Sequence, residues 1–206
     1  MTTLFAFLLP PIGYFFGSIP FGFLIGRAVG TDVRAQGSKN IGATNVSRVL
    51  GKKWGLLTLI LDCLKGYLPM LFASWLLPDS YRDKELIIAV TGVMAILGHM
   101  FSAYLNFKGG KGVATALGVF LFLSPPAVGI CLLVFVVSVA VSGFVSVGSL
   151  LASAFMPLLL YFFGAPRVSI GAAVMVAALI WLKHNENIDR LRKGEEKSWR
   201  KKKVVE

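Results

Sequence analysis

Long apolar runs alternate with short polar stretches along this chain, and the apolar runs predict its helices. The runs cover Leu4–Gly26, Trp54–Leu77, Leu86–Leu105, Val113–Leu123, Ala127–Val141, Val147–Phe163 and Val168–Leu182. Several of them exceed the ~18 residues at which an apolar run indicates a membrane-spanning helix. The strand-like alternation that a membrane β-barrel needs is not visible. We therefore expect an all-α polytopic membrane protein with seven transmembrane helices, some of them short.

The number of spans depends on how the middle of the chain is divided. Val113–Leu123 is too short to cross a hydrocarbon core of ~30 Å as a straight helix, and Ser124-Pro-Pro126 breaks the chain after it. If the loop before this run and the C-terminal tail lie on one side, an even number of crossings must separate them. Four short helices meet this condition and give seven spans. A re-entrant pair over Val113–Val141 would also meet it and leave five; we favour seven.

The distribution of positive charge predicts the orientation in the membrane. Residues 27–53 carry six Lys or Arg and one acidic residue, Asp32, and the tail of residues 183–206 carries nine Lys or Arg. Basic loops stay on the cytoplasmic side, so we expect the N-terminus outside and the C-terminus in the cytoplasm. Residues 1–206 form a single predicted membrane domain that ends in this basic tail.

The composition fits a membrane protein and accounts for the high net charge. Hydrophobic residues make up 56% of the chain and charged residues 15%, against roughly 25% charged residues in a soluble domain. A formal net charge of +11 would suggest nucleic acid in a soluble protein. Here the excess lies beside apolar spans, where topology and anionic headgroups explain most of it. We expect membrane lipids and anionic substrates as partners, and no nucleic acid.

The polar stretch Gly37–Gly55 concentrates groups that bind anions. It contains several glycines, three lysines and no carboxylate, and its other hydrogen-bonding side chains include Ser38, Asn40, Thr44, Asn45, Ser47 and Arg48. Glycine lets backbone N–H groups approach a ligand closely, and phosphate suits such a set of donors. A basic cytoplasmic loop without a ligand is the alternative interpretation.

A second polar stretch on the same side is Asn106–Gly112. It holds two lysines and three glycines: Lys108, Gly109, Gly110, Lys111 and Gly112. The glycines open a predicted helix whose free N–H groups and dipole point at the cytoplasmic face. A Walker loop would have Ser or Thr at position 112 and a strand before it, so we do not expect an ATPase.

A third polar stretch begins where the last span ends. His184 and Asn187 are three residues apart and therefore share one face of a helix. An amphipathic tail lying on anionic lipid is the alternative interpretation.

Ionisable residues also occur inside the predicted spans. Asp62 and Lys65 share one helical face in the second span, and His99 lies near the inner end of the third. Charges inside a span face the bundle interior or water. We interpret Asp62 and Lys65 as an ion pair that fixes packing or as part of a site, and His99 as a hydrogen-bonded packing residue.

The inner face is therefore rich in cations, amides and hydroxyls and poor in strong nucleophiles. The sequence has no HExxH motif, no Cys/His cluster and no convincing Ser–His–Asp order, so we expect neither a metal nor a cofactor. Such a site suits phosphate binding and the stabilisation of developing negative charge. A transporter would instead concentrate polar groups near the bilayer midplane.

Three motifs occur in order along the chain. They are Gly37-Ser-Lys-Asn-Ile-Gly-Ala-Thr-Asn-Val-Ser-Arg48 with Gly51, then Gly98-His-Met-Phe with Phe107-Lys-Gly-Gly-Lys-Gly-Val-Ala-Thr115, and finally His184-x-x-Asn-Ile-x-Arg190 with Gly194-x-Glu196. In sequence and spacing they resemble the PlsY family of bacterial acyl-phosphate:glycerol-3-phosphate acyltransferases, and the resemblance covers essentially the whole chain. Two places depart from the family pattern: Lys39 stands where a glycine is usual, and Gly143-Phe144 where a more polar pair is common.

The resemblance implies an enzyme of the bacterial inner membrane with seven helices and a cytoplasmic active site. The family transfers a fatty acyl group from acyl phosphate to the 1-hydroxyl of glycerol 3-phosphate. The products are lysophosphatidic acid and inorganic phosphate, in the first acylation of phospholipid synthesis, and no cofactor is needed.

The resemblance also implies roles for individual residues. Ser38, Arg48 and one of Lys108 or Lys111 would hold glycerol 3-phosphate. The acyl-phosphate side and the transition-state oxyanion would be lined by Asn40, Asn45, Ser146, His184 and Asn187. Further binding candidates are Thr44, Gly109, Gly110 and Gly112. Glu196 would anchor the group, and the acceptor's own phosphate would take the hydroxyl proton. The four catalytic candidates are Ser38, Arg48, His184 and Asn187.

Two other classes of protein remain as alternatives. A channel or transporter for phosphate or a phospho-metabolite would use the same basic loops and predicts charge on both faces. A lipid-binding scaffold without chemistry leaves the many small polar residues of Gly37–Gly55 unexplained.

Overall fold

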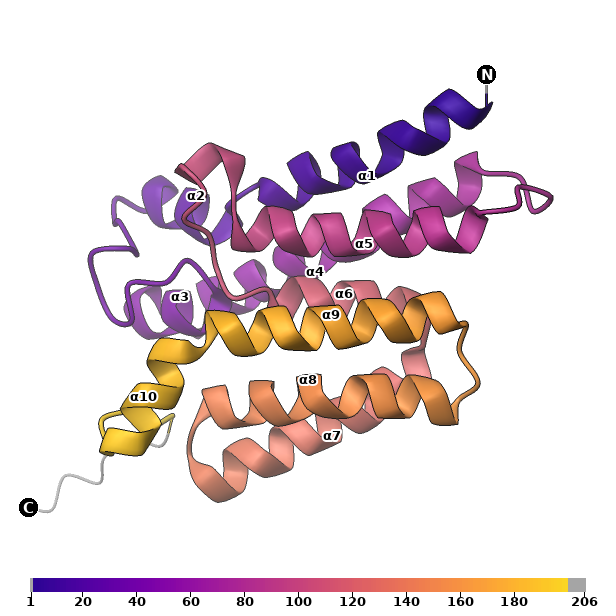
Figure 1. Cartoon of the computed structure of the whole chain (residues 1–206). Coiled ribbons are helices and arrows are strands. Elements are labelled where there is room, and N and C mark those ends of the chain that lie inside the picture. Colours follow the sequence, from indigo (N-terminus) through magenta and orange to yellow (C-terminus); the bar gives the residue numbers. More distant parts are fainter. Residues whose placement is uncertain (1, 200–206) are drawn as a thin grey trace, which may run out of the picture.

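The computed structural model describes residues 2–199 of the chain, and the side chains from residue 5 onward. Every regular element in this part of the chain is helical (Figure 1). The elements are α1 (Thr2–Ser18), α2 (Phe21–Ala28), α3 (Ala43–Leu50), α4 (Lys52–Leu76), α5 (Lys84–Met100), a 3-10 turn η1 (Ala103–Leu105), α6 (Val113–Leu123), α7 (Pro125–Ser142), α8 (Val145–Phe162), α9 (Arg167–Lys183) and α10 (Asn185–Lys193). Residues 200–206 of the predicted basic tail lie outside the described part.

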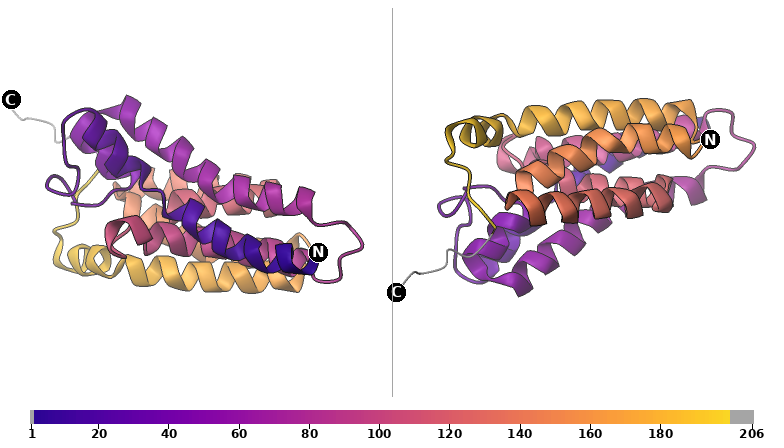
Figure 2. Two further views of the ribbon diagram at one scale, coloured as in Figure 1. Left: turned by 90° about the horizontal axis from the view of Figure 1, so that it is seen from above. Right: turned by 90° about the horizontal axis from the view of Figure 1, so that it is seen from below.

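The longer helices run roughly along one direction and pack side by side (Figures 1 and 2). Among the longer helices the most extensive contacts are those of α1 with α5, α4 with α6, α7 with α8, and α8 with α9. The segments α2, α3 and α10 lie together at one end of the bundle, and the α4–α5 loop lies at the other. The three polar stretches that the sequence singles out therefore meet at one end.

Five helical segments are long and apolar enough to cross a membrane. They are Phe5–Ala28, Lys52–Leu76, Lys84–Leu105, Pro125–Ser142 and Val145–Phe162. α9 and α10 pass the same test together but are bent by 54°, and α6 has only 11 residues. Each of the seven predicted apolar runs is helical, while length and composition support five or six spans. Seven crossings stays a prediction.

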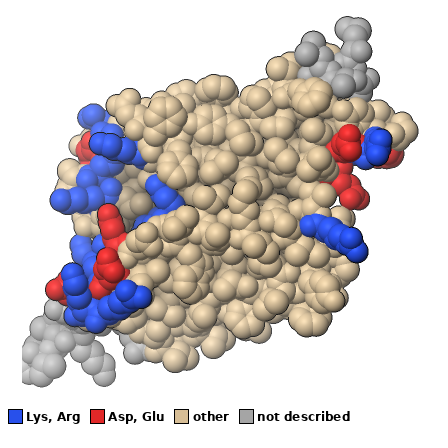
Figure 3. Space-filling view, in the orientation of Figure 1, with Lys and Arg blue, Asp and Glu red and all other residues tan. Residues whose placement is uncertain are grey.

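The surface agrees with a membrane environment. Figure 3 shows Lys, Arg, Asp and Glu gathered at the two ends of one face, with a broad uncharged band between them. On α7 large apolar side chains such as Leu133, Val136 and Val141 are more than half exposed. In water a patch of this kind would be a liability, whereas lipid covers it at no cost.

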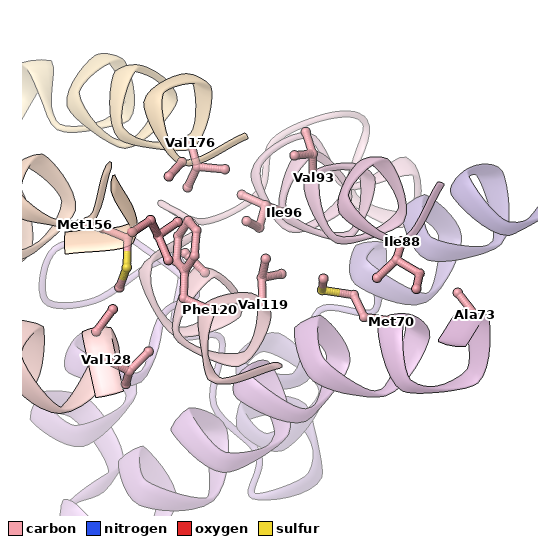
Figure 4. Close-up of a cluster of buried hydrophobic side chains, with 14 of the residues drawn as sticks. Met70, Ala73, Ile88, Val93, Ile96, Val119, Phe120, Val128, Met156 and Val176 are labelled. Atoms are coloured by element: carbon pink, nitrogen blue, oxygen red, sulfur yellow. The ribbon is translucent and has the colours of Figure 1, made fainter. Parts of the chain in front are cut away.

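The interior combines an apolar core with close helix contacts. Met70, Val93, Ile96, Val119 and Phe120 meet between α4, α5 and α6 (Figure 4). At several helix crossings only glycine fits, as Gly98 and Gly118 illustrate. A Cβ atom on Gly98 would collide with the carbonyl oxygen of Tyr14, and one on Gly118 with that of Cys63. Small residues at such positions let membrane helices approach closely.

Asp62 and Lys65 form the predicted ion pair inside the bundle. Lys65 Nζ lies 2.9 Å from Asp62 Oδ1 and donates a 2.7 Å hydrogen bond to the carbonyl oxygen of Ile19. Both charged side chains are almost fully buried, and His99 Nδ1 lies 3.7 Å from the same carboxylate. The pair thereby joins α4 to the break between α1 and α2.

The stretch Gly37–Gly55 contains a short helix that the sequence pattern did not predict. α3 starts after Gly42 and ends at Gly51, whose φ of 98° favours glycine. Val46 on α3 is fully buried against Val33 and Ile41 in a small apolar cluster. This cluster fastens the polar stretch to the bundle.

Candidate active site

The charged end of the bundle encloses a polar cavity of about 800 Å³. Its walls come mainly from the α2–α3 loop, α3, the α5–α6 loop, the start of α8, and α9–α10 with the segment that follows, and α4 to α7 add further side chains. The predicted site residues on it are Ser38, Asn40, Thr44, Asn45, Arg48, Gly109, Lys111, Gly112, Ser146, His184, Asn187 and Glu196. Residues up to 158 positions apart in sequence, Ser38 and Glu196, are thus brought to one place.

Two of the predicted residues take other positions. Lys108 lines a neighbouring cavity of about 400 Å³ together with Arg34 and with Lys39, which borders both cavities. Gly110 packs against the ring of His99, where a Cβ atom would collide with Nε2. Of the two lysines between which the sequence could not choose, Lys111 is the one on the polar cavity.

Asn45 organises the loop before α3. Its amide oxygen accepts a 2.7 Å hydrogen bond from the backbone nitrogen of Ser38. Its amide nitrogen donates to the carbonyl oxygens of Val33 at 2.9 Å and Asn40 at 2.8 Å. The side chain is 1% exposed, so these bonds use most of its capacity and fix where Ser38 lies.

Glu196 joins the third motif to α8. Its Oε1 accepts hydrogen bonds from Ser146 Oγ at 2.8 Å and from Asn187 Nδ2 at 2.5 Å. Its Oε2 accepts from Arg190 Nε at 2.8 Å. Burial alone would raise the pKa of Glu196, but the hydrogen bonds from Arg190, Asn187 and Ser146 lower it overall. Glu196 is therefore an ionised anchor at neutral pH.

Lys111 extends the same network. Its ammonium group donates a hydrogen bond to the amide oxygen of Asn187. Burial, reinforced by the nearby positive charge of Arg190, lowers the pKa of Lys111 to about 8. The side chain is still mostly charged at pH 7, and its positive charge is only partly hydrated, which strengthens its attraction for an anion.

His184 lies at the bend between α9 and α10, because α9 ends one residue before it and α10 begins one residue after it. Its Nδ1 is 2.7 Å from the carbonyl oxygen of Ile180, so Nδ1 carries the proton and Nε2 is left for the cavity side. Burial, together with the charge of Lys111, lowers the pKa of His184 to about 4. The imidazole is neutral at physiological pH.

Arg48 projects from the last turn of α3. Its Nη2 donates a 3.0 Å hydrogen bond to the carbonyl oxygen of Lys197. Burial lowers the pKa of Arg48, and the carboxylate of Glu196 partly offsets this effect. The guanidinium group nevertheless stays charged at neutral pH. Arg48 and Lys111 thus give the cavity two fixed positive charges.

The cavity also has walls that sequence reasoning did not assign to the site. They include Lys39, Asp62, His99, Lys183, Arg190 and Lys197. His99 was interpreted as a packing residue, Asp62 as a member of an ion pair that fixes packing or belongs to a site, and Lys197 as part of the basic tail. Asp62 and His99 lie on different helices and Lys197 lies beyond α10, so only the tertiary fold brings them to one cavity. Within residues 2–199, no cluster of three or more His, Cys, Asp or Glu side chains could hold a metal ion.

An apolar cavity of about 470 Å³ adjoins the polar one. The two share wall residues, among them Thr44, Val113 and Val145. From there the apolar cavity runs between α4, α6, α7, α8 and α9 toward Met156 and Ala173. A molecule with an anionic head and a hydrocarbon tail would fit across the pair of cavities.

Comparison with known proteins agrees with this geometry. The family model described as glycerol-3-phosphate acyltransferase matches residues 7–194. The glycerol-3-phosphate acyltransferase of Desulfotalea psychrophila is 63% identical over 95% of this chain and 99% of its own length. That of Trichlorobacter lovleyi is 50% identical over 91% of this chain and 94% of its own.

Two solved structures have the same fold. One is the glycerol 3-phosphate form of PlsY (YgiH), an integral membrane glycerol 3-phosphate acyltransferase; its TM-score is 0.89 at 40% identity, over 95% of this chain and 96% of that one. The other is the lysophosphatidic acid form of PlsY, with a TM-score of 0.87 at 40% identity, over 95% of each chain. The resemblance inferred from the three motifs is confirmed, and the chain belongs to the glycerol-3-phosphate acyltransferase family of integral membrane proteins.

Proposed function

We propose that this protein transfers a fatty acyl group from acyl phosphate to the 1-hydroxyl of glycerol 3-phosphate, at the cytoplasmic face of a bacterial inner membrane. Acyl transfer to glycerol 3-phosphate is the activity for which its relatives are named. The observation that carries the donor assignment is the junction of a cationic cavity with an apolar cavity inside one bundle. An acyl phosphate has this shape: an anionic head and a hydrocarbon tail.

The two cavities divide the substrates between them. Ser38, Arg48 and Lys111 hold the phosphate of glycerol 3-phosphate, and the tail of the donor lies in the apolar cavity. Ser146, His184 and Asn187 face the acyl phosphate. Charge-assisted hydrogen bonds contribute roughly 1.5–3 kcal/mol each, and several are needed because two anions must be brought together against their repulsion.

In the reaction the 1-hydroxyl oxygen of the acceptor attacks the acyl carbonyl carbon. The new C–O ester bond forms, negative charge develops on the carbonyl oxygen, and the bond from carbon to the phosphate oxygen breaks. Inorganic phosphate leaves with that bonding pair. Cations and N–H donors fixed beforehand around the carbonyl lower the barrier by stabilising the oxyanion.

The proton of the attacking hydroxyl goes to the acceptor's own phosphate. His184, with a pKa of about 4, is a weak base at neutral pH. Glu196 is fully occupied by Ser146, Asn187 and Arg190. A phosphate monoester has a second pKa near ~6, closer to the working pH and therefore better suited to accept the proton.

The same proposal places the molecule in the membrane. The whole chain acts as one membrane domain that crosses seven times, with the N-terminus outside and α10 in the cytoplasm. The cluster of basic loops at one end of the bundle supports this orientation. The product, lysophosphatidic acid, remains in the inner leaflet, and phosphate is released to the cytoplasm.

Phosphate release by the purified protein tests the proposal. Palmitoyl phosphate should release phosphate only when glycerol 3-phosphate is present, with one lysophosphatidic acid formed per phosphate. Arg48→Ala should lower turnover by a factor of roughly 10²–10³ while the protein still inserts. Arg192→Ala, at an exposed position on α10 away from the cavity, is the matched control.

Other outcomes of that assay would overturn the proposal. Release without the acceptor indicates a hydrolase, and full activity of Arg48→Ala removes the central residue of the site. A transporter predicts flux of phosphate into liposomes without acyl transfer. Neither the names of the relatives nor the one-sided placement of the polar cavity favours a transporter.

A further inference from the structure

The segment after α10 turns back across the charged end of the bundle. Figure 2 shows it leaving α10 toward the α2–α3 region. Lys197 Nζ donates a 2.8 Å hydrogen bond to the carbonyl oxygen of Gly37. The backbone nitrogen of Trp199 donates a 2.7 Å hydrogen bond to the carbonyl oxygen of Gly143. The carbonyl oxygen of Lys197 in turn accepts from Arg48. The segment thus ties the α2–α3 loop and α3 to the α7–α8 turn.

Its two ends face different cavities. Lys197 lies on the polar cavity, and Trp199 lies on the apolar one. Around the apolar cavity the polar wall residues are Thr44, Ser47 and Lys52 near the charged end and Ser149 and Ser153 on α8. Trp199 is held at the charged end by its bond to Gly143, which lies two residues before Val145, a residue that lines both cavities.

We propose that Trp199 belongs to the acyl-donor site, where its indole ring covers the first carbons of the acyl chain beside the carbonyl group. This inference rests on the proposed function. The hydrogen bond that holds position 199 comes from the backbone, so the indole ring is not needed to keep the segment in place. The ring contributes apolar surface. Trp199 is 46% exposed, so part of this surface is accessible to a ligand.

Covering the head end has two chemical consequences. Contact with the indole ring fixes the depth of the acyl chain and so the position of its carbonyl carbon relative to His184 and Arg48. It also keeps water from the mixed anhydride, which would otherwise hydrolyse without transfer. Loss of the ring should therefore weaken donor binding and raise acceptor-independent phosphate release.

Kinetics of full-length variants reconstituted in lipid test this role. Trp199→Ala should raise KM for hexadecanoyl phosphate about tenfold, the loss expected for roughly half of a large apolar side chain. KM for glycerol 3-phosphate should not change. Because the ring covers carbons common to all donors, the factor should be the same for dodecanoyl phosphate. Trp199→Phe should restore most of the donor affinity.

Trp75→Ala supplies the matched control. Trp75 is 70% exposed and lies near the end of α4 opposite the charged cavity, so its removal should leave both KM values unchanged. Thermal unfolding of each variant verifies folding; if Trp199→Ala unfolds, Trp199→Leu replaces it in the same comparison.

The outcomes separate this inference from the proposed function. If the wild type transfers acyl groups and Trp199→Ala has an unchanged KM for both donors, the inference is wrong. A lower kcat with both KM values unchanged would also contradict it, because it would indicate a structural role. If the wild type itself forms no lysophosphatidic acid, the proposed function fails, and the inference fails with it.

Discussion

Asn187 donates a 2.5 Å hydrogen bond to Glu196, and so the last polar motif of the chain closes on itself. The same carboxylate accepts from Ser146 on α8 and Arg190 on α10. Two residues on the polar cavity, Asn187 and Ser146, therefore depend on one carboxylate for their position. We therefore expect Glu196 to act through these neighbours, as a positioning residue.

Glu196→Gln should keep the size of the side chain and lose its function. An amide offers one oxygen in place of two and would set an N–H group against an arginine or an asparagine donor. The unpaired donors should cost about 1.5–3 kcal/mol, a loss of roughly 10- to 100-fold in kcat/KM. Steady-state kinetics with palmitoyl phosphate measures this. Glu195→Gln, at the exposed neighbouring position, should retain full activity.

Binding of glycerol 3-phosphate should weaken as pH rises through 8. The pKa of Lys111 is lowered to about 8, first by burial and then by Arg190. Only the protonated amine attracts the acceptor phosphate, so its contribution is present below pH 8 and is lost above it. As pH rises past 8, kcat/KM for glycerol 3-phosphate should fall and then level off roughly 10- to 100-fold lower, because Ser38 and Arg48 still hold the phosphate.

Lys111→Arg isolates this effect. A guanidinium group stays charged throughout the range, so the alkaline decline should move beyond pH 9.5 even if the activity of the variant is lower overall. A wild-type profile that is flat from pH 7 to 9.5 would show that Lys111 does not bind the acceptor through its charge.

Removing one charge of the buried ion pair should lower the stability of the protein more than removing both charges. Asp62 and Lys65 are 2.9 Å apart and almost inaccessible. Lys65→Met leaves the carboxylate of Asp62 buried without its cation, a loss of about 3–5 kcal/mol. The double variant Asp62→Leu with Lys65→Met leaves no unpaired charge and should recover much of it. Thermal unfolding in detergent compares the three proteins; equal midpoints for the single and double variants would contradict a structural pair.

The apolar runs predicted the bundle helices because burial in lipid demands little beyond length and hydrophobicity. The convergence of Ser38, Lys111 and Asn187 could be predicted because each lies in a polar stretch that the charge pattern assigns to the same side of the membrane. α3 was missed because it is only eight residues long and Thr44, Asn45 and Ser47 interrupt its apolar positions. Its helix depends on Val46 packing into a cluster that only the tertiary fold creates.

Other parts of the site depend on geometry that a linear pattern does not contain. Asp62 and His99 lie on different helices, and their side chains reach the cavity only because α4 and α5 pack as they do. Trp199 lies among basic residues typical of a solvated tail. Its contact with Gly143 joins positions 56 residues apart, and no periodicity along the chain signals it.

The depth of the apolar cavity should determine which acyl chains the enzyme uses. Ala173 on α9 and Met156 on α8 line the part of the cavity away from the charged end, and Ala173 is 1% exposed. A larger side chain at position 173 would fill space that the end of a long acyl chain needs. Ala173→Leu should therefore lower kcat/KM for hexadecanoyl phosphate by roughly tenfold, the cost of displacing one or two methylene groups. Dodecanoyl phosphate, whose tail ends sooner, should be used as before.

Ala178→Leu is the matched control. It adds the same atoms at an exposed position of α9 that does not line the cavity, and it should leave kcat/KM unchanged for both donors. An equal loss with both donors would mean that the substitution disturbs the bundle rather than the end of the acyl site. An unchanged preference would place the acyl chain outside this cavity.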